Sequence, residues 1–223
     1  MGTGTIKLYS ARACPFAHRT RLVLAHKSVD FEVLEVDLKN KPAWFTREVS
    51  AYGKVPAIDH DGHHIYESAV INEYLDEVFP RPPLLPAQPA RRAAARIWID
   101  YANTRFAPAF GALLRAPSSQ DQASARQALL QALKDIEEGA LAPLSAAGPF
   151  FFGPTPSLVD FAFYPWFERW AALEHYRDLP VPRELARIER FRRAVRELEA
   201  TKAHENPPEY YIERYASVAP AKS

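Results

Sequence analysis

Short runs of apolar residues alternate with a helical stripe in the first third of the chain. Residues 6–9 form a compact apolar run, and residues 31–36 mix apolar with acidic residues at a period of two, which favours two strands. Between them, residues 15–27 carry apolar side chains at the spacing of one helical face. The order strand, helix, strand predicts a right-handed parallel crossover and therefore a small α/β sheet.

The next part of the pattern predicts an antiparallel hairpin. Two short segments with strand character, residues 56–59 and 64–66, flank the dipeptide Asp61-Gly62. This dipeptide suits a two-residue turn because both of its positions tolerate positive φ. The hairpin adds two strands to the predicted sheet.

A helix and a proline-rich segment close this first domain. Residues 67–79 repeat apolar side chains at helical spacing, and another helical segment is expected near residues 42–49, so the predicted order is βαβ, α, ββα. The prolines that follow are too dense for any regular element, at Pro80, Pro82, Pro83, Pro86 and Pro89. We therefore expect a first domain over residues 1–80 and a linker over residues 81–89.

Residues 90–223 predict an all-helical second domain. This part is rich in Ala, Arg, Glu and Leu, and its apolar residues recur at helical spacing over residues 98–114, 123–141, 158–173 and 183–198. Ser157 lies three residues before Asp160, which is the spacing of a capping box at the start of the third of these helices.

Composition and charge narrow the class of protein. Hydrophobic residues make up 48% of the 223 residues, enough to bury a substantial core, so intrinsic disorder is not expected. The formal net charge is +1, and basic and acidic residues alternate along the chain. Because a phosphate backbone needs a one-sided positive field, nucleic acid is not an expected partner.

Neither export nor a membrane is expected. Residues 1–10 lack the basic start and the apolar stretch of a signal peptide. Residues 140–159 carry no charge, but prolines and glycines interrupt them, so they predict a helix end and a loop. The single cysteine excludes an internal disulfide framework and suits a reducing compartment, so the cytoplasm is the expected location.

Cys14 is the strongest candidate for chemistry. It directly follows a predicted strand and loop, and Pro15 after it favours the first position of a helix, where a missing N–H costs nothing. Unpaired backbone N–H groups and the helix dipole stabilise a thiolate at this position more than a thiol. A lone cysteine elsewhere is usually a small buried hydrophobe, but this position predicts a nucleophile.

The neighbourhood of Cys14 also limits its redox chemistry. Ala17 occupies the place of the second cysteine in a C-x-x-C pair, so the chain cannot run an internal dithiol cycle. Any redox turnover must therefore take a thiol from outside the chain. Glutathione is the obvious donor.

Four segments in order resemble a known family. Cys14-Pro15-Phe16-Ala17 with Arg19-Thr20-Arg21-Leu22 resembles the start of cysteine-type glutathione transferases, especially the omega and lambda classes. Further similar segments begin at Lys39, Gly53 and Tyr66, and read KNKPAWF, GKVP and YESA. The resemblance covers essentially the whole chain. It implies the glutathione transferase fold, with an α/β thioredoxin-like N-terminal domain followed by an all-α C-terminal domain, and it implies a homodimer.

The resemblance also implies four contacts with glutathione. Lys41 would pair with the glycyl carboxylate, and the backbone of Val55 would bond the cysteinyl unit in the manner of a strand. Glu67 would meet the γ-glutamyl amine, and Ser68 would bind the γ-glutamyl carboxylate. Ser68 is also expected at the start of a helix, where a hydroxyl and backbone N–H groups converge on an anion.

Three further residues are implied to shape this site. Pro56 would be a cis proline that exposes the backbone of Val55 to a peptide-like ligand, whereas an ordinary turn proline is trans. Pro15 and Phe16 would lie beside the thiol. No metal is expected, because the candidate histidines straddle a two-residue turn without a second cluster nearby, at His60, His63 and His64.

Two alternatives to the cysteine mechanism concern hydroxyl groups. Other transferase classes activate glutathione with a Tyr or Ser hydroxyl near this end of the first strand, so Tyr9 and Ser10 are alternatives to Cys14.

Aromatic residues of the second domain could line a pocket for the second substrate, although such residues are usually core. The candidates are Phe106, Phe110, Trp166, Trp170, Tyr210 and Tyr211.

Three functions follow as hypotheses. The first is a glutathione-dependent thiol transferase, or an enzyme like dehydroascorbate reductase, in which Cys14 attacks a disulfide or another oxidised centre and glutathione resolves the mixed disulfide. The second is a transferase that conjugates glutathione to a small electrophile. The third is a noncatalytic binding module with the same fold.

Overall fold

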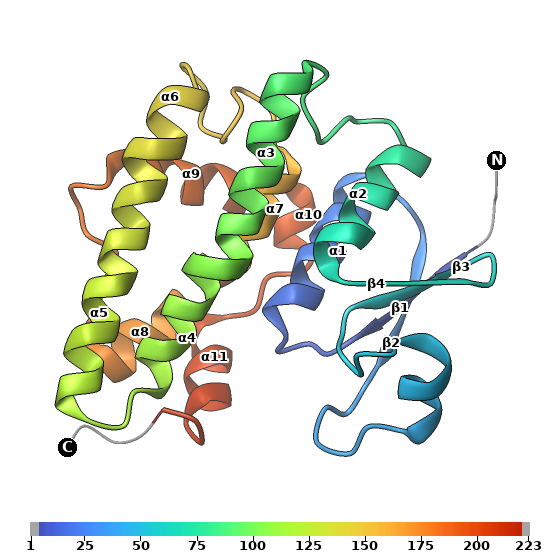
Figure 1. Ribbon diagram of the computed structural model, residues 1–223, viewed down its shortest axis with the longest axis horizontal. Helices are drawn as coiled ribbons and strands as arrows, with labels where there is room; N and C mark the ends of the chain where they lie inside the picture. The colour runs from blue at the N-terminus through green and yellow to red at the C-terminus, as the bar shows by residue number, and fades with distance from the viewer. Residues whose placement is uncertain (1–4, 220–223) are drawn as a thin grey trace. The chain divides into compact units, whose positions relative to one another are not determined.

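The sheet expected in the first third of the chain is present in the computed structural model, which describes residues 5–219 (Figure 1). Contacts within the chain divide it into two compact units, the first ending at Leu84 and the second beginning at Leu85. The strands of the first unit are arranged in the order β2-β1-β3-β4. They are β1 (Ile6–Ser10), β2 (Phe31–Glu35), β3 (Ala57–His60) and β4 (His63–Tyr66).

The parallel crossover predicted from the pattern is confirmed. β1 and β2 pair in parallel, from Ile6 opposite Phe31 to Ser10 opposite Glu35. Their connection contains α1 (Pro15–His26). β1 pairs on its other side with β3 in the antiparallel sense, so it lies inside the sheet and is flanked by two strands.

The predicted hairpin is also confirmed. β3 and β4 pair in the antiparallel sense, with His60 opposite His63 at the turn. Asp61 and Gly62 both have positive φ, 52° and 81°, as a mirror-image two-residue turn requires. The Gly62 N–H donates to Asp59 Oδ1 at 3.0 Å, which closes the turn.

Helices cover both faces of this sheet. α1 and α2 (Ser68–Val78) pack side by side on one face, and the short π-helical segment η1 (Phe45–Val49) lies beyond the other (Figure 1). Lys27, directly after α1, has a buried ammonium that donates to Asp76 Oδ1 at 2.7 Å and to the carbonyls of Phe79 and Pro82, each at 2.8 Å. This buried cation ties the end of α1 to the end of α2.

The second unit is helical, as predicted. Its main helices are α3 (Pro89–Tyr101), α4 (Ala107–Arg115), α5 (Ser119–Lys134), α7 (Leu158–Glu168), α8 (Trp170–Arg177) and α9 (Ala186–Arg196), with the shorter α6 (Ala142–Leu144), α10 (Glu199–Lys202) and α11 (Pro208–Tyr215). Within residues 5–219, no helix combines the length and apolar character needed to cross a bilayer.

Prolines explain where the helix boundaries depart from the prediction. The π-helical segments η2 (Ala102–Phe106) and η3 (Asp135–Leu141) interrupt two helices that were expected to be continuous, and each comes shortly before a proline that lacks a helical N–H, Pro108 or Pro143. The expected helix over residues 158–173 is likewise divided at Arg169, one turn after Pro165. Pro89 begins α3, where a proline fits the first turn.

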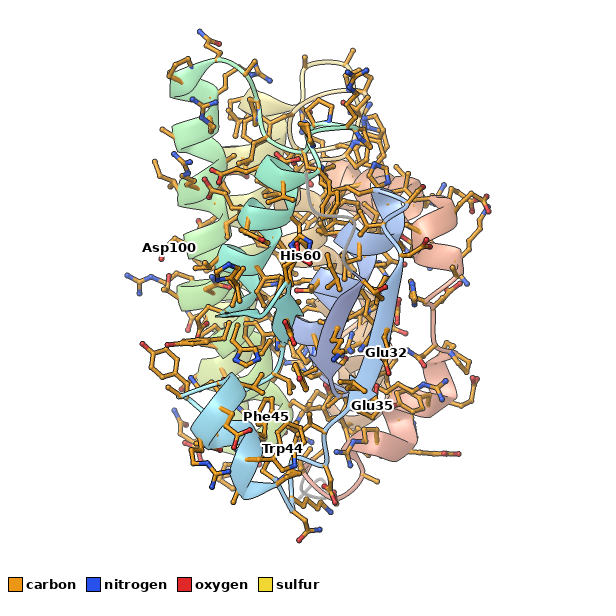
Figure 2. All side chains as sticks on the ribbon, turned by 90° about the vertical axis from the view of Figure 1, so that its right-hand side faces the viewer. Glu32, Glu35, Trp44, Phe45, His60 and Asp100 are labelled. Carbon is orange, nitrogen blue, oxygen red and sulfur yellow. The ribbon has the colours of Figure 1, made fainter. Side chains whose placement is uncertain are left out.

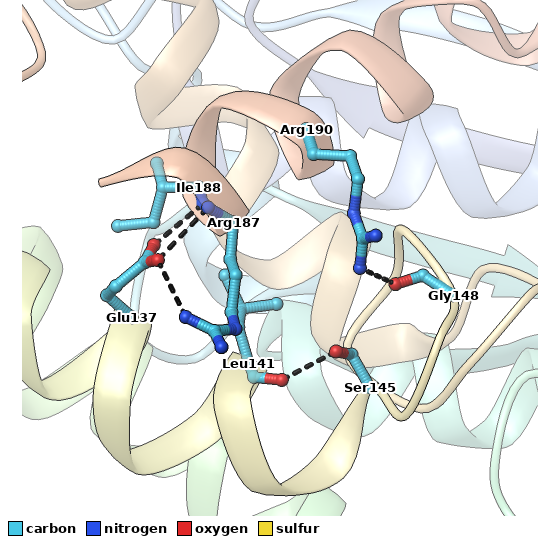
Figure 3. Close-up of polar contacts among 7 residues, drawn as sticks. All are labelled: Glu137, Leu141, Ser145, Gly148, Arg187, Ile188 and Arg190. Carbon is cyan, nitrogen blue, oxygen red and sulfur yellow. Dashed lines mark hydrogen bonds and ion pairs between the residues drawn. The ribbon is translucent and has the colours of Figure 1, made fainter. Parts of the chain in front are cut away.

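A carboxylate from a distant helix caps α9. Leu185, at the N-cap position, has no capping side chain. Instead, Glu137 accepts hydrogen bonds from the backbone N–H groups of Arg187 at 3.0 Å and Ile188 at 2.9 Å (Figure 3). Arg190, one turn further along, donates to the carbonyl of Gly148. These contacts fix α9 against η3 and the loop that follows it.

The predicted capping box at the start of α7 is confirmed. The Asp160 carboxylate is fully buried and accepts hydrogen bonds from the Ser157 N–H at 2.7 Å, the Ser157 hydroxyl at 2.6 Å and the Phe151 N–H at 3.0 Å. Burial raises the pKa of Asp160 to about 6, and the hydrogen bonds only partly oppose this effect.

Asp160→Asn tests the linkage between this carboxylate and stability. Since the pKa of Asp160 is about 6 in the folded chain and 3.8 for an ordinary aspartate, its contribution to stability is fully present below pH 3.8 and is lost as the pH rises through about 6. The free energy of unfolding of the wild type, minus that of Asp160→Asn, should therefore fall by roughly 2–3 kcal/mol across this window. Urea unfolding at several pH values measures it, and a difference that grows with pH would contradict the account.

Candidate active site

Cys14 lies at the N-cap position of α1, where the sequence predicts it. Its backbone N–H donates to the carbonyl of Ala11 at 2.8 Å, and Pro15 is the first residue of the helix. The side chain is partly buried, with its sulfur 3.7 Å from the carbonyl oxygen of Val55. The thiol is therefore placed at a helix start and is not sealed in the interior.

A buried arginine fixes the loop that carries this cysteine. The Arg21 guanidinium donates to the Ser10 hydroxyl at 2.6 Å and to the Arg12 carbonyl at 3.1 Å. The Arg12 N–H donates to Glu35 at 2.9 Å. Glu35 is the last residue of β2 (Figure 2). Ser10 is fully buried and already accepts from Arg21, so its hydroxyl is a poor candidate for activating a ligand.

The environment of Tyr9, the other residue whose hydroxyl could activate glutathione, also indicates a structural role. Its side chain is 7% exposed, and its ring packs 6.0 Å from that of Trp44 and 5.8 Å from that of Phe45, measured between centroids. Burial, with smaller contributions from the charges of Asp59 and Glu32, raises the pKa of Tyr9, which opposes ionisation of the hydroxyl. Of the two kinds of group, the thiol is the better placed nucleophile.

A groove in the first unit adjoins Cys14. It encloses about 400 Å³, counting the space at its open side, and it meets the cysteine at Val55, whose carbonyl faces the sulfur. We call it the Val55 groove. Its lining residues are Phe16, Ser50, Lys54, Val55, Pro56, Tyr66, Glu67 and Ser68. Five residues expected at the site from the sequence are therefore brought together here: Phe16, Val55, Pro56, Glu67 and Ser68.

One wall of the groove is the turn before β3, which two hydrogen bonds hold in place. The peptide bond between Val55 and Pro56 is cis, as the family resemblance implies. Ser50 is fully buried, and its hydroxyl donates to the Lys54 carbonyl at 3.0 Å and accepts from the Lys54 N–H at 3.3 Å. These two bonds hold the backbone that presents Val55 to the groove.

The lysines at this site are arranged differently from the expectation. Lys41 is not among the residues that line the groove, and its ammonium donates to the carbonyl of Gly53 at 2.9 Å. Lys54 does line the groove, and sequence reasoning missed it. The available signal was its position directly before Val55, the residue whose backbone is expected to meet a ligand.

Glu67, which also lines the groove, is held in an unusual backbone conformation. Its φ is 73° and its ψ is 115°, in a region that residues with a Cβ rarely adopt, and its side chain is exposed. Such strain persists only where the surrounding structure enforces it, and it is common at ligand sites. The conformation turns the chain from β4 into α2, so that Ser68 begins the helix at the edge of the groove.

Arg19 is a second residue that sequence reasoning missed. Its side chain is 1% exposed, and its Nη1 donates to the Ser68 hydroxyl at 3.3 Å. Burial lowers the pKa of Arg19 to about 9, while the charge of Cys14 acts in the opposite direction, so Arg19 stays protonated at neutral pH. A buried cation is therefore hydrogen-bonded to Ser68 and interacts electrostatically with Cys14.

The aromatic residues proposed to line a second pocket are mostly core. Phe106, Phe110, Trp166, Trp170 and Tyr211 are each 3% exposed or less, and Tyr210 is half-buried. Phe106 packs against Phe167, and Phe110 packs edge-on against Trp170. The ordinary interpretation of aromatics at helical spacing holds for these five, and they are not candidates for substrate contact.

The histidines of the hairpin show no metal-binding arrangement. His60 is buried, and its Nδ1 lies 2.8 Å from the Tyr74 hydroxyl, whereas His63 and His64 are exposed on β4. In the part of the chain that the structure describes, no group of three or more His, Cys, Asp or Glu side chains could hold a metal ion.

Comparisons with known proteins assign the class. Residues 13–78 match the family described as Glutathione S-transferase, N-terminal domain, and residues 89–194 match that described as Glutathione S-transferase, C-terminal domain. A thioredoxin-like sheet unit with a cysteine at the start of its first helix, followed by a helical unit, is the arrangement found above. The chain belongs to the glutathione S-transferase family, a family of enzymes.

Individual relatives refine this assignment. The chain is 37% identical to glutathione S-transferase omega-1 of Mus musculus over 172 residues, which are 77% of this chain and 69% of that protein. The structure is similar to a tau-class glutathione S-transferase from Mangifera indica, with a TM-score of 0.89, 26% identity and coverage of 96% and 99% of the two chains. It is also similar to rice GST1 in complex with glutathione, with a TM-score of 0.87, 27% identity and coverage of 98% of each chain.

The strain at Glu67 can be measured by comparing two substitutions. Both Glu67→Gly and Glu67→Ala remove the side chain, but only glycine adopts the observed φ without a Cβ penalty. We expect Glu67→Gly to be the more stable of the two by about 1 kcal/mol in urea unfolding. Alanine equal to or more stable than glycine would show that the conformation is not strained.

Proposed function

We propose that this protein is a glutathione-dependent thiol transferase, with Cys14 as its nucleophile. The observation that carries the proposal is the position of Cys14: its partly exposed sulfur lies at the N-cap of α1 and 3.7 Å from the Val55 carbonyl at the edge of the groove. A thiolate, not a thiol, attacks sulfur, and a helix N-terminus favours the thiolate. The omega-class relative from mouse supports the same class of chemistry.

The proposed reaction proceeds through one mixed disulfide. The Cys14 thiolate attacks a disulfide that contains a glutathionyl group, forms a bond to that group's sulfur and expels the other sulfur as a thiolate, which takes up a proton. A second glutathione thiolate then attacks the mixed disulfide, regenerates the Cys14 thiolate and leaves as oxidised glutathione. In sum, the substrate disulfide and one molecule of free glutathione give the substrate thiol and oxidised glutathione, whose two sulfurs come from the free glutathione and from the glutathionyl group that Cys14 carried. Because Cys14 is the only cysteine, no internal thiol competes in the second step.

The charges around the groove support the expected orientation of glutathione. Lys54, which lines the groove, would bind the glycyl carboxylate, and Lys41 would reach it by releasing the Gly53 carbonyl. The Val55 backbone would pair with the cysteinyl unit beside Cys14. Glu67 would bind the γ-glutamyl amine, and Ser68 would bind the γ-glutamyl carboxylate at the start of α2. The similarity to a rice transferase solved in complex with glutathione supports this co-substrate.

Pro15, Phe16 and Pro56 would shape the site without reacting. Pro15 starts α1 directly after the thiol, and Phe16 and Pro56 line the groove. The proposal requires no metal: the groups that act are a thiolate, two ammonium groups, a carboxylate and a hydroxyl.

Conjugation of glutathione to a small electrophile is the second candidate function. The specific observation in its favour is the extent of the similarity to the tau-class transferase, which covers 96% of this chain. In this reaction the thiolate of bound glutathione would attack the electrophile and Cys14 would be dispensable. A noncatalytic binding module is the remaining alternative.

Cys14→Ser separates these functions. Reduction of hydroxyethyl disulfide by glutathione should fall by about 100-fold or more, because a serine hydroxyl does not form the mixed disulfide, while conjugation to chlorodinitrobenzene should be retained. Tyr9→Phe is the matched control and should leave disulfide reduction unchanged. Full disulfide reductase activity in Cys14→Ser would refute the proposal. Failure of the wild type to bind millimolar glutathione in calorimetry would instead favour the noncatalytic alternative.

We propose a homodimer in the cytoplasm, acting on a small disulfide or electrophile. The family resemblance supports the dimer, and the single cysteine suits a reducing compartment. Light scattering should give twice the 25.2 kDa mass of the chain. A particle with the mass of one chain would contradict this assembly.

A further inference from the structure

We infer that a cleft in the second unit binds a small zwitterion with an apolar side chain, that is, an amino acid or a short peptide, and that Tyr164 is one of its polar contacts. The cleft encloses about 760 Å³, counting the space at its open side, and its lining residues fall between Tyr164 and Pro208. We call it the Tyr164 cleft. It shares no residue with the Val55 groove, so the inference goes beyond the proposed function and does not depend on it.

Aromatic rings of α7 give the cleft an apolar surface. Tyr164 and Phe167 both line it, and each is 3% exposed. Ala171 of α8 and Pro208 at the start of α11 extend this surface. The apolar part of a ligand can pack on these four residues, while the charged side chains around them bind its polar ends.

The Tyr164 hydroxyl is a buried polar group that can bind a ligand in this cleft. Buried hydroxyls are ordinarily hydrogen-bonded, but within residues 5–219 no group of the protein forms a hydrogen bond with this one. Burial raises the pKa of Tyr164, as do the charges of Glu168 and Glu205, while Arg196 and Arg192 oppose the shift. All four charged residues line the cleft, so the hydroxyl faces it, keeps its proton and can donate or accept.

The arginines of α9 keep donors for a carboxylate. Arg192 Nη1 donates to Glu189 Oε2 at 3.1 Å, and Arg193 Nε donates to Glu189 Oε1 at 3.0 Å. Arg196 Nε donates to Glu205 Oε1 at 2.8 Å. A guanidinium has five N–H donors, so a single bond to a glutamate leaves each arginine able to bind a second anion.

Carboxylates in the same lining favour a ligand that also carries a positive charge. Four glutamates line the cleft together with the three arginines. Glu168 is held by the Tyr211 hydroxyl and the Asn206 N–H, whereas Glu174 is exposed and Glu205 bonds Arg196 through Oε1 alone. A simple anion would be repelled by these carboxylates, and a simple cation would be repelled by the arginines. A zwitterion can place each end beside the opposite charge.

Ligand-observed NMR titration with three matched probes tests the charge requirement. The dipeptide glycyl-phenylalanine carries both charges, its N-acetyl derivative has only the carboxylate, and its amide has only the ammonium. We expect the dipeptide to bind with millimolar or tighter affinity and each derivative to bind about 10-fold more weakly, because each loses one set of charge-assisted hydrogen bonds. Equal binding of either derivative, or no binding of the dipeptide, would overturn the inference.

Tyr164→Phe tests the position of the site. Loss of the hydroxyl should weaken dipeptide binding by about five-fold, while the midpoint of urea unfolding should not fall, since the hydroxyl has no partner within the described chain. Tyr101→Phe is the matched control: it removes the same atom from a tyrosine outside the cleft, whose hydroxyl donates to Asp135 Oδ2 at 2.6 Å, and it should leave dipeptide binding unchanged. Wild-type binding in Tyr164→Phe, or a lowered unfolding midpoint, would overturn the inference.

Ser68→Ala separates the Tyr164 cleft from the Val55 groove. Ser68 lines the groove and not the cleft, so this substitution should leave dipeptide binding unchanged. Weaker binding in Ser68→Ala would place the dipeptide in the groove and overturn the inference. The chemistry of Cys14 is measured separately by disulfide reduction, so failure of the proposed function and failure of this inference are distinguishable.

Discussion

The candidate active site depends on one geometric constraint, the short loop between the end of β1 and the start of α1. β1 ends at Ser10, inside the sheet, and α1 begins at Pro15, so the intervening loop has little freedom. Arg21 fixes that loop from the helix side by bonding both Ser10 and the Arg12 carbonyl. The result is a cysteine whose sulfur stays close both to the start of α1 and to the Val55 carbonyl at the groove.

Two local features that cost folding free energy lie next to Ser68. Glu67 has a backbone conformation that disfavours any residue with a Cβ, and Arg19 is a charge with almost no exposure to solvent. Both are neighbours of Ser68, one along the chain and the other by a hydrogen bond. Elsewhere the buried charges have plain structural partners, as Lys27 has in Asp76 and Glu137 has in the first turn of α9. The strained backbone of Glu67 and the buried charge of Arg19 therefore both lie next to Ser68.

Local patterns predicted much of the fold. The parallel crossover, the hairpin turn at Asp61-Gly62 and the capping box at Ser157 are specified by neighbouring residues, and the structure has all three. Contacts between distant residues were less accessible. The carboxylate that caps α9 comes from Glu137, far away in sequence, and the π-helical segments before Pro108 and Pro143 depend on how a long helix accommodates a proline.

In the candidate site, too, the local sequence predicted some residues, whereas others are brought to the site only by the folded chain. Cys14 at a helix start follows from its position before Pro15, and the position of Ser68 follows from the start of a helix. Arg19 and Lys54 were not found, because a surface charge is the ordinary interpretation of either residue and only the folded chain brings them to Ser68 and to the groove. The most direct test of the central claim is a crystal structure of the protein after reaction with oxidised glutathione. We expect a disulfide bond between Cys14 and glutathione, with the γ-glutamyl group at Glu67 and Ser68 and the cysteinyl backbone paired with Val55. An unmodified Cys14, or glutathione bound away from this groove, would contradict it.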